Sequence, residues 1–222
     1  MEDILLFENQ ALTTADTVAN RLRAEILRGD LKVDQVLRQD KIASRLGTST
    51  IPVREALFQL NAEGLVEFIP NRGAFVSRLS AEELREIYDL RLSLESLALS
   101  KAMPRLTDDH IEQAEAILEQ MDFERDIIEW GELNWNFHRV LLEPAEMPRL
   151  IGMLRNLHLN LIRFLLQNVS APEEIELRSE HRLEHAQILD ACRARDAEIG
   201  EILLRRHLTM TSNLLLRISS EE

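Results

Sequence analysis

The 222-residue chain lacks a second cysteine, a long apolar run and an excess of positive charge. The single cysteine, Cys192, can form no disulfide within the chain, which is typical of a protein in a reducing cytosol. No uninterrupted apolar stretch approaches the roughly 20 residues that a membrane-spanning helix needs. The acidic N-terminus, MEDILLFENQ, is unlike a secretory signal. We therefore expect a cytoplasmic protein with no membrane association.

The net charge of −13 is distributed unequally along the chain. Residues 1–79 carry ten Lys and Arg against eleven Asp and Glu, whereas residues 80–222 carry sixteen against twenty-eight. The acidity therefore belongs to the second part, and residues 11–79 alone carry ten basic against eight acidic side chains. This weak positive balance predicts few phosphate contacts per subunit, so tight binding to DNA would depend on dimerisation.

Residues 39–60, QDKIASRLGTSTIPVREALFQL, contain two short helical patterns joined by a tight connection. The first apolar stripe ends at Gly47, a residue that readily adopts positive φ. A residue among 48–50 can cap the second helix, and Pro52 lies in its first turn, where the missing N–H costs nothing. This order is typical of a helix-turn-helix, whose second helix presents its N-terminal side chains to base edges. A simple helical hairpin would share the same outline.

The residues that follow the second helix predict two strands. Residues 65–69 have the composition of a strand, 70–73 (Pro-Asn-Arg-Gly) that of a turn, and 74–76 that of a returning strand. A two-stranded wing directly behind the second helix makes the motif a winged helix-turn-helix.

The beginning of the chain adds one helix and an arm. Residues 1–13, with an apolar cluster at 4–7, are too short to fold alone, and we interpret them as an arm or a flexible end. Thr14 is expected to cap a helix that runs to Arg28, with Gly29 as its stop. Residues 1–79 are therefore predicted to form one domain.

From Ser80 onward the sequence predicts only helices. Ser80 and Glu83 form a capping box that opens a long helix to about Met103. Further helices are expected at residues 107–121, 127–142, 148–168, 172–192 and 196–219. The predicted fold is mostly α, with an N-terminal winged helix-turn-helix and a C-terminal all-α bundle over residues 80–222. The helix at 148–168 is apolar nearly all round, which favours the centre of the bundle or a subunit interface.

Three of the six histidines are arranged in a way that suggests a metal site. His185 precedes Asp196 by eleven residues and His207 follows it by eleven, so a helical hairpin turning at Asp196 places both at one level. Asn134 and His138, at i and i+4, share a face of another helix. Three imidazoles and an amide oxygen inside a bundle could bind a divalent transition metal. Ordinary polar core or surface residues would have the same spacing.

Three short segments follow one another within the first domain: PVREAL (52–57), EGLVE (63–67) and NRGAFV (71–76). Together they closely resemble the GntR family of bacterial transcription regulators. The family commonly has Arg where this chain has Thr50, and some members have Arg at Asp40, so the DNA sequence recognised would differ. The resemblance implies DNA contacts, with Arg54 the best matched, at Arg45, Ser49, Thr50, Arg54, Arg72 and Gly73.

The helical part resembles the FCD effector domain of the FadR-type branch of the family, through NFHRVLL (136–142), EHAQILDACRARD (184–196) and RRHL (205–208). Many members bind a metal through an aspartate and three histidines. For this chain the resemblance implies a site for a divalent transition metal, such as zinc or nickel, formed by Asn134, His138, His185 and His207. Asn134 stands at the aspartate position, so one negative charge is missing from the ligand set.

The remaining polar candidates have two interpretations each. Arg91, in YDLRLSLES (88–96), suits a bidentate grip on an effector carboxylate, and an internal ion pair with Glu95 is the alternative. His110 and His181 are expected to be solvated or capping residues, and His158 to line a pocket or the core.

The function predicted from these features is a ligand-responsive transcription regulator and not an enzyme. It would bind a palindromic double-stranded DNA operator as a homodimer, with a metal-assisted site for a small organic acid in the helical domain. Two alternatives stay open. One is a metal-dependent enzyme of organic-acid metabolism, since three histidines with an open coordination position can activate water. The other is a metal-free regulator whose histidines bind the effector directly.

Overall fold

The computed structural model describes residues 13–220, apart from the side chains at positions 166, 167, 171, 172 and 220. The expected arm, with its apolar cluster at residues 4–7, therefore lies outside the described residues. The chain divides into two compact units, Met1–Arg78 and Leu79–Glu222. Each unit has a hydrophobic core of its own.

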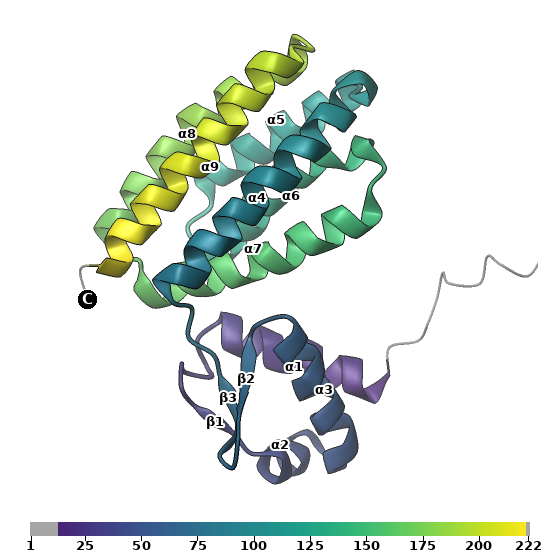
Figure 1. Cartoon of the computed structure of the whole chain (residues 1–222), viewed down its shortest axis with the longest axis vertical. Coiled ribbons are helices and arrows are strands. Elements are labelled where there is room, and N and C mark those ends of the chain that lie inside the picture. The colour runs from purple at the N-terminus through teal and green to yellow at the C-terminus, as the bar shows by residue number, and fades with distance from the viewer. Residues whose placement is uncertain (1–12, 221–222) are drawn as a thin grey trace, which may run out of the picture. The chain divides into compact units, whose positions relative to one another are not determined.

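The first unit contains helices and a small sheet (Figure 1). Its helices are α1 (Thr14–Leu27), α2 (Gln39–Leu46) and α3 (Thr50–Ala62), and its strands are β1 (Val36–Leu37), β2 (Val66–Ile69) and β3 (Gly73–Val76). Side chains from the three helices and the sheet share one core, in which Leu22, Leu57 and Val76 are fully buried. The winged helix-turn-helix predicted from the sequence is therefore present.

Thr13, and not the expected Thr14, caps α1. The Thr13 hydroxyl accepts a hydrogen bond from the backbone N–H of Asp16, and the Asp16 carboxylate accepts one from the backbone N–H of Thr13. In a capping box the acidic side chain lies three residues after the capping residue. Asp16 lies three residues after Thr13 and two after Thr14, so Thr13 is the cap. The predicted stop is confirmed, because Gly29 has a φ of 72° just past the helix.

A left-handed glycine makes the connection between α2 and α3. Gly47 has a φ of 66°, and the N–H of Thr48 donates to the carbonyl of Ala43 at 3.0 Å. Ser49 occupies the N-cap position of α3, but its side chain makes no capping bond to any described residue. The side chains of Ser49 and Thr50 therefore stay exposed at the start of α3.

The sheet has one strand more than the predicted two-stranded wing. Its order is β1-β3-β2, with antiparallel pairing throughout, and Val36 of β1 lies opposite Phe75 of β3. A two-residue strand has no alternation to recognise in a sequence. It forms because the backbone N–H and C=O groups of β3 pair with those of β1. A local sequence pattern does not reveal this pairing. The turn between β2 and β3 is where it was expected, with positive φ at Asn71 and Gly73.

In the described residues the second unit is a bundle of helices (Figure 1). They are α4 (Ala81–Ala102), α5 (Asp108–Phe123), α6 (Ile127–Leu142), α7 (Pro148–Asn168), α8 (Ala171–Arg193) and α9 (Ala197–Ser220), with short 3-10 turns at Met103–Arg105 and Glu143–Ala145. Every predicted helix end in this unit lies within two residues of the observed one. The Ser80 capping box is confirmed, since the Ser80 hydroxyl accepts from the N–H of Glu83 at 3.2 Å.

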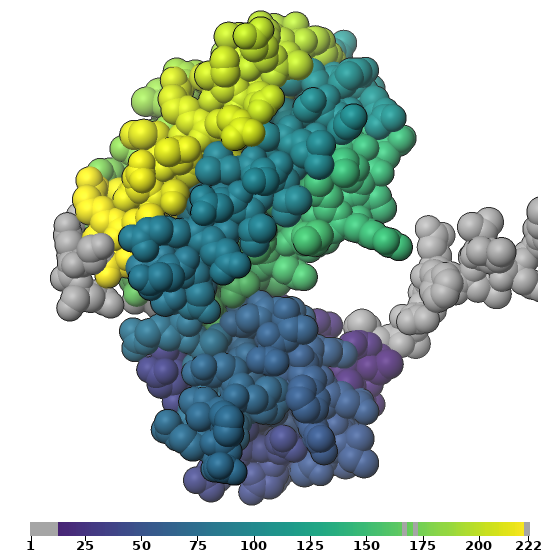
Figure 2. All heavy atoms as spheres, viewed as in Figure 1, coloured from purple at the N-terminus to yellow at the C-terminus, as the bar shows by residue number. Residues whose placement is uncertain are grey.

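Helix α9 packs along α4 and α8, and Figure 2 shows α9 in yellow beside α4 in teal. Helix α7, which we expected at the centre of the bundle or in a subunit interface, is not enclosed on all sides within the second unit. It buries Leu154 and Phe164, but Met153 keeps 57% of its surface exposed. No helix in the described part of the chain combines the length and the apolarity needed to cross a membrane.

Candidate nucleic-acid interface and metal centre

The N-terminal turn of α3 presents polar side chains to solvent. Val53 and Leu57 are completely buried in the first unit, which fixes the face of the helix that points inward. Ser49, Thr50 and Arg54 are exposed. All three predicted contacts of this helix are therefore accessible, as a recognition helix requires.

Arg54 is held along the surface of α3. Its guanidinium lies over the ring of Phe58, with the Cζ atom 5.5 Å from the ring centroid. Phe58 in turn packs against Phe68 of β2, with 4.9 Å between ring centroids. A cation stacked on an aromatic face loses less side-chain freedom on binding than one moving freely in solvent. The stack thus holds Arg54 at the exposed surface of α3.

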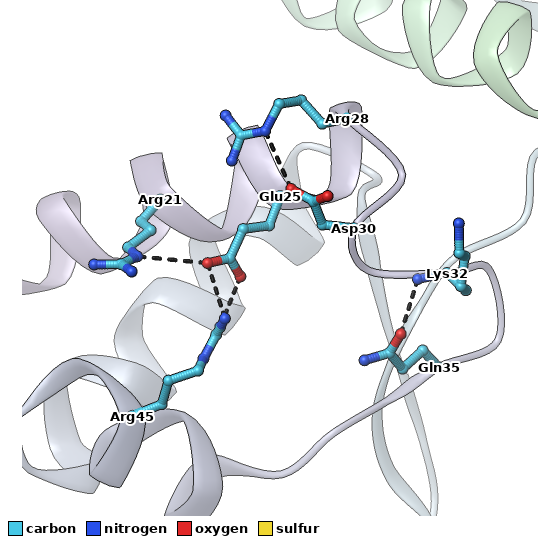
Figure 3. Close-up of polar contacts among 7 residues, drawn as sticks. All are labelled: Arg21, Glu25, Arg28, Asp30, Lys32, Gln35 and Arg45. Carbon is cyan, nitrogen blue, oxygen red and sulfur yellow. Dashed lines mark hydrogen bonds and ion pairs between the residues drawn. The ribbon is translucent and has the colours of Figure 1, made fainter.

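Arg45 has an internal partner, which the sequence analysis did not anticipate. Both of its terminal nitrogens bond the carboxylate of Glu25 on α1, at 2.9 and 2.6 Å (Figure 3). Arg21 reaches the same carboxylate at 3.4 Å. Glu25 is 6% exposed and pairs with α2 through Arg45, so this contact fixes α2 against α1. The contact of Arg45 with DNA stays a prediction, and this ion pair argues against it.

The tip of the wing is exposed. Arg72 lies over the ring of Phe75 at 5.2 Å, and Gly73 has a φ of 100°. That backbone conformation is unfavourable for any residue with a Cβ, so the tight turn requires the glycine. The two predicted wing contacts therefore lie together at an accessible edge.

Three histidines meet inside the second unit. His138 of α6, His185 of α8 and His207 of α9 each offer one nitrogen, and these nitrogens lie within 4.8 Å of one another. The Nε2 atoms of His185 and His207 are 3.2 Å apart. All three rings are at most 3% exposed. The level placement of His185 and His207 that was derived from the turn at Asp196 is therefore observed.

Two carboxylates orient this cluster. The Nδ1 atom of His138 lies 2.9 Å from Glu95 of α4, and the Nδ1 atom of His207 lies 2.7 Å from Glu184 of α8. A carboxylate beside Nδ1 holds the proton on that nitrogen and leaves the Nε2 lone pair free for a metal. Neither contact was predicted from the sequence, because each joins helices or turns whose mutual placement a spacing rule does not give.

The residues present fit a divalent transition metal. The Nε2 atom of His138 and the Oδ1 atom of Asn134 are buried and have no hydrogen-bond partner among the described residues. Two nitrogens that ligate one zinc ion at about 2.0–2.1 Å lie roughly 2.9–3.4 Å apart, which includes the His185–His207 separation. Imidazole nitrogens and an amide oxygen that converge inside a bundle are a donor set that such an ion takes.

His181 belongs to the same cluster, which corrects its expected place as a solvated or capping residue. Its ring is 4% exposed and lies 4.7 Å from that of His207. Its Nδ1 atom is 2.8 Å from the carbonyl oxygen of Leu177. The signal for this residue was in the sequence, because His181 and His185 are at i and i+4 on one helix. His110 is a capping residue as expected, bonded to Thr107.

His181, His185 and His207 are neutral at ordinary pH. Burial lowers the pKa of His185 and His207 well below the usual histidine range. Burial also lowers the pKa of His181 to about 3. Neutral imidazoles are the form that ligates metals, so His185 and His207 need no deprotonation to accept one.

Arg91 pairs internally, as its second interpretation proposed. Its Nε atom donates to Glu95 at 2.7 Å, and the guanidinium lies over the ring of Tyr88. Burial opposes ionisation of Glu95, but Arg91 and His138 together lower the pKa of that carboxyl to about 2. Arg91 still lines a small cavity beside the histidines, so a role in ligand binding remains compatible with the ion pair.

This cavity has a volume of about 20 Å³, enough for one water molecule. Its walls include Arg91, Asn134, His158 and His207. His158 is 4% exposed, and its Nε2 atom has no hydrogen-bond partner among the described residues. The expectation that His158 lines a pocket is therefore confirmed. A larger groove of about 870 Å³ runs between α5 and α8 and includes Trp130 and His185 in its lining.

Comparisons with known proteins agree with this geometry. Residues 14–76 match the family described as bacterial regulatory proteins, gntR family, and residues 86–210 match the FCD domain. The HTH-type transcriptional repressor GlaR of Escherichia coli K12 is 30% identical, over 84% of this chain and 89% of its own. The repressor RspR of the same strain is 26% identical, over 90% and 88%. The solved structure of E. coli McbR/YncC has a TM-score of 0.75 at 26% identity, covering 93% of this chain and 99% of that one.

Proposed function

The chain belongs to the GntR family of bacterial transcriptional regulators and carries an FCD effector domain, and we propose on this premise that it binds a palindromic DNA operator as a homodimer. We further propose that a divalent metal and a small organic acid bind together in the helical unit and control that binding. The protein acts as a regulator and not as an enzyme.

The exposed start of α3 supports the first part of the proposal. Arg54 is exposed and held by Phe58, and the wing tip offers Arg72 and Gly73. A single reading head of this kind covers only a few base pairs and makes few phosphate contacts. Two copies related by a two-fold axis double both, and such a dimer recognises a palindrome.

The convergence of His138, His185 and His207 carries the second part of the proposal. Three buried imidazoles, two of them oriented by carboxylates, supply the nitrogens for a divalent transition metal. Asn134 supplies an amide oxygen. Because this oxygen is neutral, a bound divalent cation keeps more of its positive charge than it would with aspartate at that position. That charge favours an anionic effector.

The walls of the cavity define the effector more closely. Arg91 brings a second positive charge to the site, which suits a carboxylate. His158 bonds the backbone of Gly131 through its other ring nitrogen and is held neutral by burial, which lowers its pKa. Its free Nε2 atom therefore accepts a hydrogen bond. A small carboxylic acid with a hydroxyl or amino group meets both requirements.

Ligand binding would couple to DNA binding through the helices that surround the site. The site residues come from α4, α6, α7, α8 and α9, so an effector that contacts them draws these helices together. The cavity has room for one water molecule, so an organic acid has to widen it. Control of DNA binding follows if the two helix arrangements place the reading heads differently and the effector prefers one of them.

Metal analysis with a thermal-shift screen tests this proposal. The chelated full-length protein is titrated with zinc, nickel and other divalent metals, and then with small organic acids at saturating metal. We expect a metal-dependent rise in melting temperature and a further rise with a subset of acids. His185→Ala and His207→Ala should abolish the first rise. His110→Gln, which keeps the capping box of α5, is the matched control.

Other outcomes would separate the alternatives. No bound metal after reloading, with acids still raising the melting temperature, would favour the metal-free regulator. Repeated turnover of an organic acid by the loaded protein would favour the enzyme. Failure to select any specific DNA site from random sequences, at any salt concentration, would overturn the regulator proposal itself.

A further inference from the structure

Ile51 is an apolar side chain that the fold of the first unit leaves in solvent. It is 68% exposed, although it lies on α3, a helix that supplies four completely buried side chains to the core. The other large apolar side chain exposed on α3, Phe58, packs on Phe68 and carries the guanidinium of Arg54. Ile51 is absent from the apolar residues that form or cover the core. The packing of this unit therefore gives no reason for an isoleucine at this position.

The geometry of α3 directs Ile51 away from the core. Residues of an α-helix are separated by about 100°, which places Ile51 roughly 170° from the mean direction of the buried side chains. These are Val53, Ala56, Leu57 and Leu60. Ile51 also lies in the first turn of α3, next to Thr50 and three residues before Arg54. It thus occupies the most outward point of the turn that a recognition helix inserts into the major groove.

The side chain at this point decides which base edge can be recognised. Isoleucine has no donor or acceptor and cannot read the polar groups of guanine, cytosine or adenine. Thymine alone among the bases places a methyl group in the major groove. We propose that Ile51 contacts the 5-methyl group of a thymine in each half-site of the operator. This inference rests on the proposed DNA-binding function and adds one specificity-determining residue to it.

The neighbouring side chains fit this assignment. Thr50 carries a methyl group of its own beside a hydroxyl, and Arg54 is held by Phe58 further along the helix. Ile51 and Thr50 therefore form the apolar part of the reading surface, and Arg54 forms the charged part. The half-site should have a thymine next to the base pair or phosphate that Arg54 contacts.

Removal of a single methyl group from the DNA tests the contact. An operator is first selected from random sequences with the full-length protein, and each thymine is then replaced by deoxyuridine, which lacks only the 5-methyl group. For one thymine per half-site we expect a loss of affinity of about three- to five-fold, the effect of one buried methyl group. Replacement in both half-sites should give roughly the square of that factor.

Protein variants complete a double-mutant cycle between the side chain at position 51 and the thymine methyl group. Ile51→Ala should bind thymine and deoxyuridine operators equally, within about 1.5-fold, because the methyl group has lost its partner. Leu183→Ala, at an apolar residue of α8 that is 69% exposed, is the matched control and should keep the discrimination. Both positions are exposed, so the melting temperatures should not change.

Three results would overturn the inference while leaving DNA binding intact. The first is a selected operator in which no thymine replacement changes affinity. The second is an Ile51→Ala protein that discriminates as well as the parent. The third is a change of oligomeric mass in Ile51→Ala with unchanged discrimination, which would make Ile51 a contact between protein copies. If selection yields no operator, the proposed function fails and this inference fails with it.

Discussion

Arg91, Glu95 and His138 form a chain of charged and polar contacts in the interior of the second unit. Arg91 and Glu95 lie one turn apart on α4, and both side chains are no more than 6% exposed. A buried ion pair is held in place by the cost of separating it, because removal of one partner leaves the other charge without water or counter-charge. Glu95 therefore supports both the arginine of the cavity and the histidine of the metal centre.

Glu95→Gln should destabilise the second unit by about 3–5 kcal/mol, because Arg91 would keep its charge in the interior without a carboxylate. Urea unfolding followed by tryptophan fluorescence measures this, since Trp130 and Trp135 both lie in α6 of that unit. Glu201→Gln, which breaks an exposed pair with Arg205, is the control and should cost at most about 1 kcal/mol. Equal losses in the free energy of unfolding would show that the buried Arg91–Glu95 pair contributes no more stability than an exposed pair.

Asn134→Asp should bind a divalent metal more tightly than the parent protein. A carboxylate at this buried position adds a negative charge beside the cation, and the amide oxygen that it replaces has no other partner among the described residues. Competition with a chromophoric chelator gives the dissociation constants of both proteins. Unchanged affinity would mean that residue 134 does not ligate the metal and that the three histidines form the site alone.

At the scale of elements, the Arg45–Glu25 pair shows that a partly exposed arginine can stabilise the packing of two helices. It ties α2 to α1 through two hydrogen bonds, and α2 in turn packs against α3. The position of α3 therefore depends on an ion pair within the first unit. A sequence pattern places Arg45 next to the helix-turn-helix, but only the packed unit shows that its guanidinium points to Glu25 (Figure 3).

Arg45→Ala should lower the stability of the first unit by roughly 1–2 kcal/mol, since Glu25 loses the partner that compensates its burial. It should leave the slope of log K against log salt unchanged, because the fold already pairs the guanidinium of Arg45 with Glu25. Arg54→Ala should do the reverse, keeping stability and weakening specific binding by about 1–3 kcal/mol. Thermal melts and a salt titration of binding measure both. A reduced slope in Arg45→Ala would return Arg45 to the DNA interface.

The sequence predicted elements best where their signals are local. Ser80 and Glu83 mark the start of α4 by themselves, and Pro148 marks that of α7, so these helices were placed within a residue. The strand β1 was missed because its two residues become a strand only when β3 lies beside them. His181 was misplaced for a similar reason, since its burial depends on which face of α8 packs inward.

At the scale of the whole chain, the two units carry different functions and different charges. The second unit is acidic, and two of its carboxylates orient the buried histidine cluster. The geometry of that centre was predictable in part, because equal distances from a helical turn give equal levels. The carboxylates that orient the histidines were not predictable, since Glu95 and Glu184 reach them across tertiary contacts.

The same histidines make the stability of the metal-free second unit depend on pH. Burial lowers the pKa of four of them below the ordinary value of 6.5, and they are His158, His181, His185 and His207. The unfolded chain therefore binds more protons than the folded one at any pH between the folded and unfolded pKa values. Stability is fully present above about pH 6.5 and is lost as the pH falls below it.

Each of these four histidines contributes a slope of about 1.4 kcal/mol per pH unit in that window, so together they contribute roughly 5.5 kcal/mol per unit. A domain stable by about 5–15 kcal/mol should then unfold within a few pH units below 6.5.

We expect His158→Phe to reduce the slope by about 1.4 kcal/mol per unit, because phenylalanine fills the ring space and cannot be protonated. Urea titrations of the chelated protein at a series of pH values, followed by tryptophan fluorescence, measure this slope. His110→Gln should leave the slope unchanged, since His110 caps α5 outside the histidine cluster. A slope that His158→Phe does not alter would show that His158 titrates alike in the folded and the unfolded protein, so that burial does not lower its pKa.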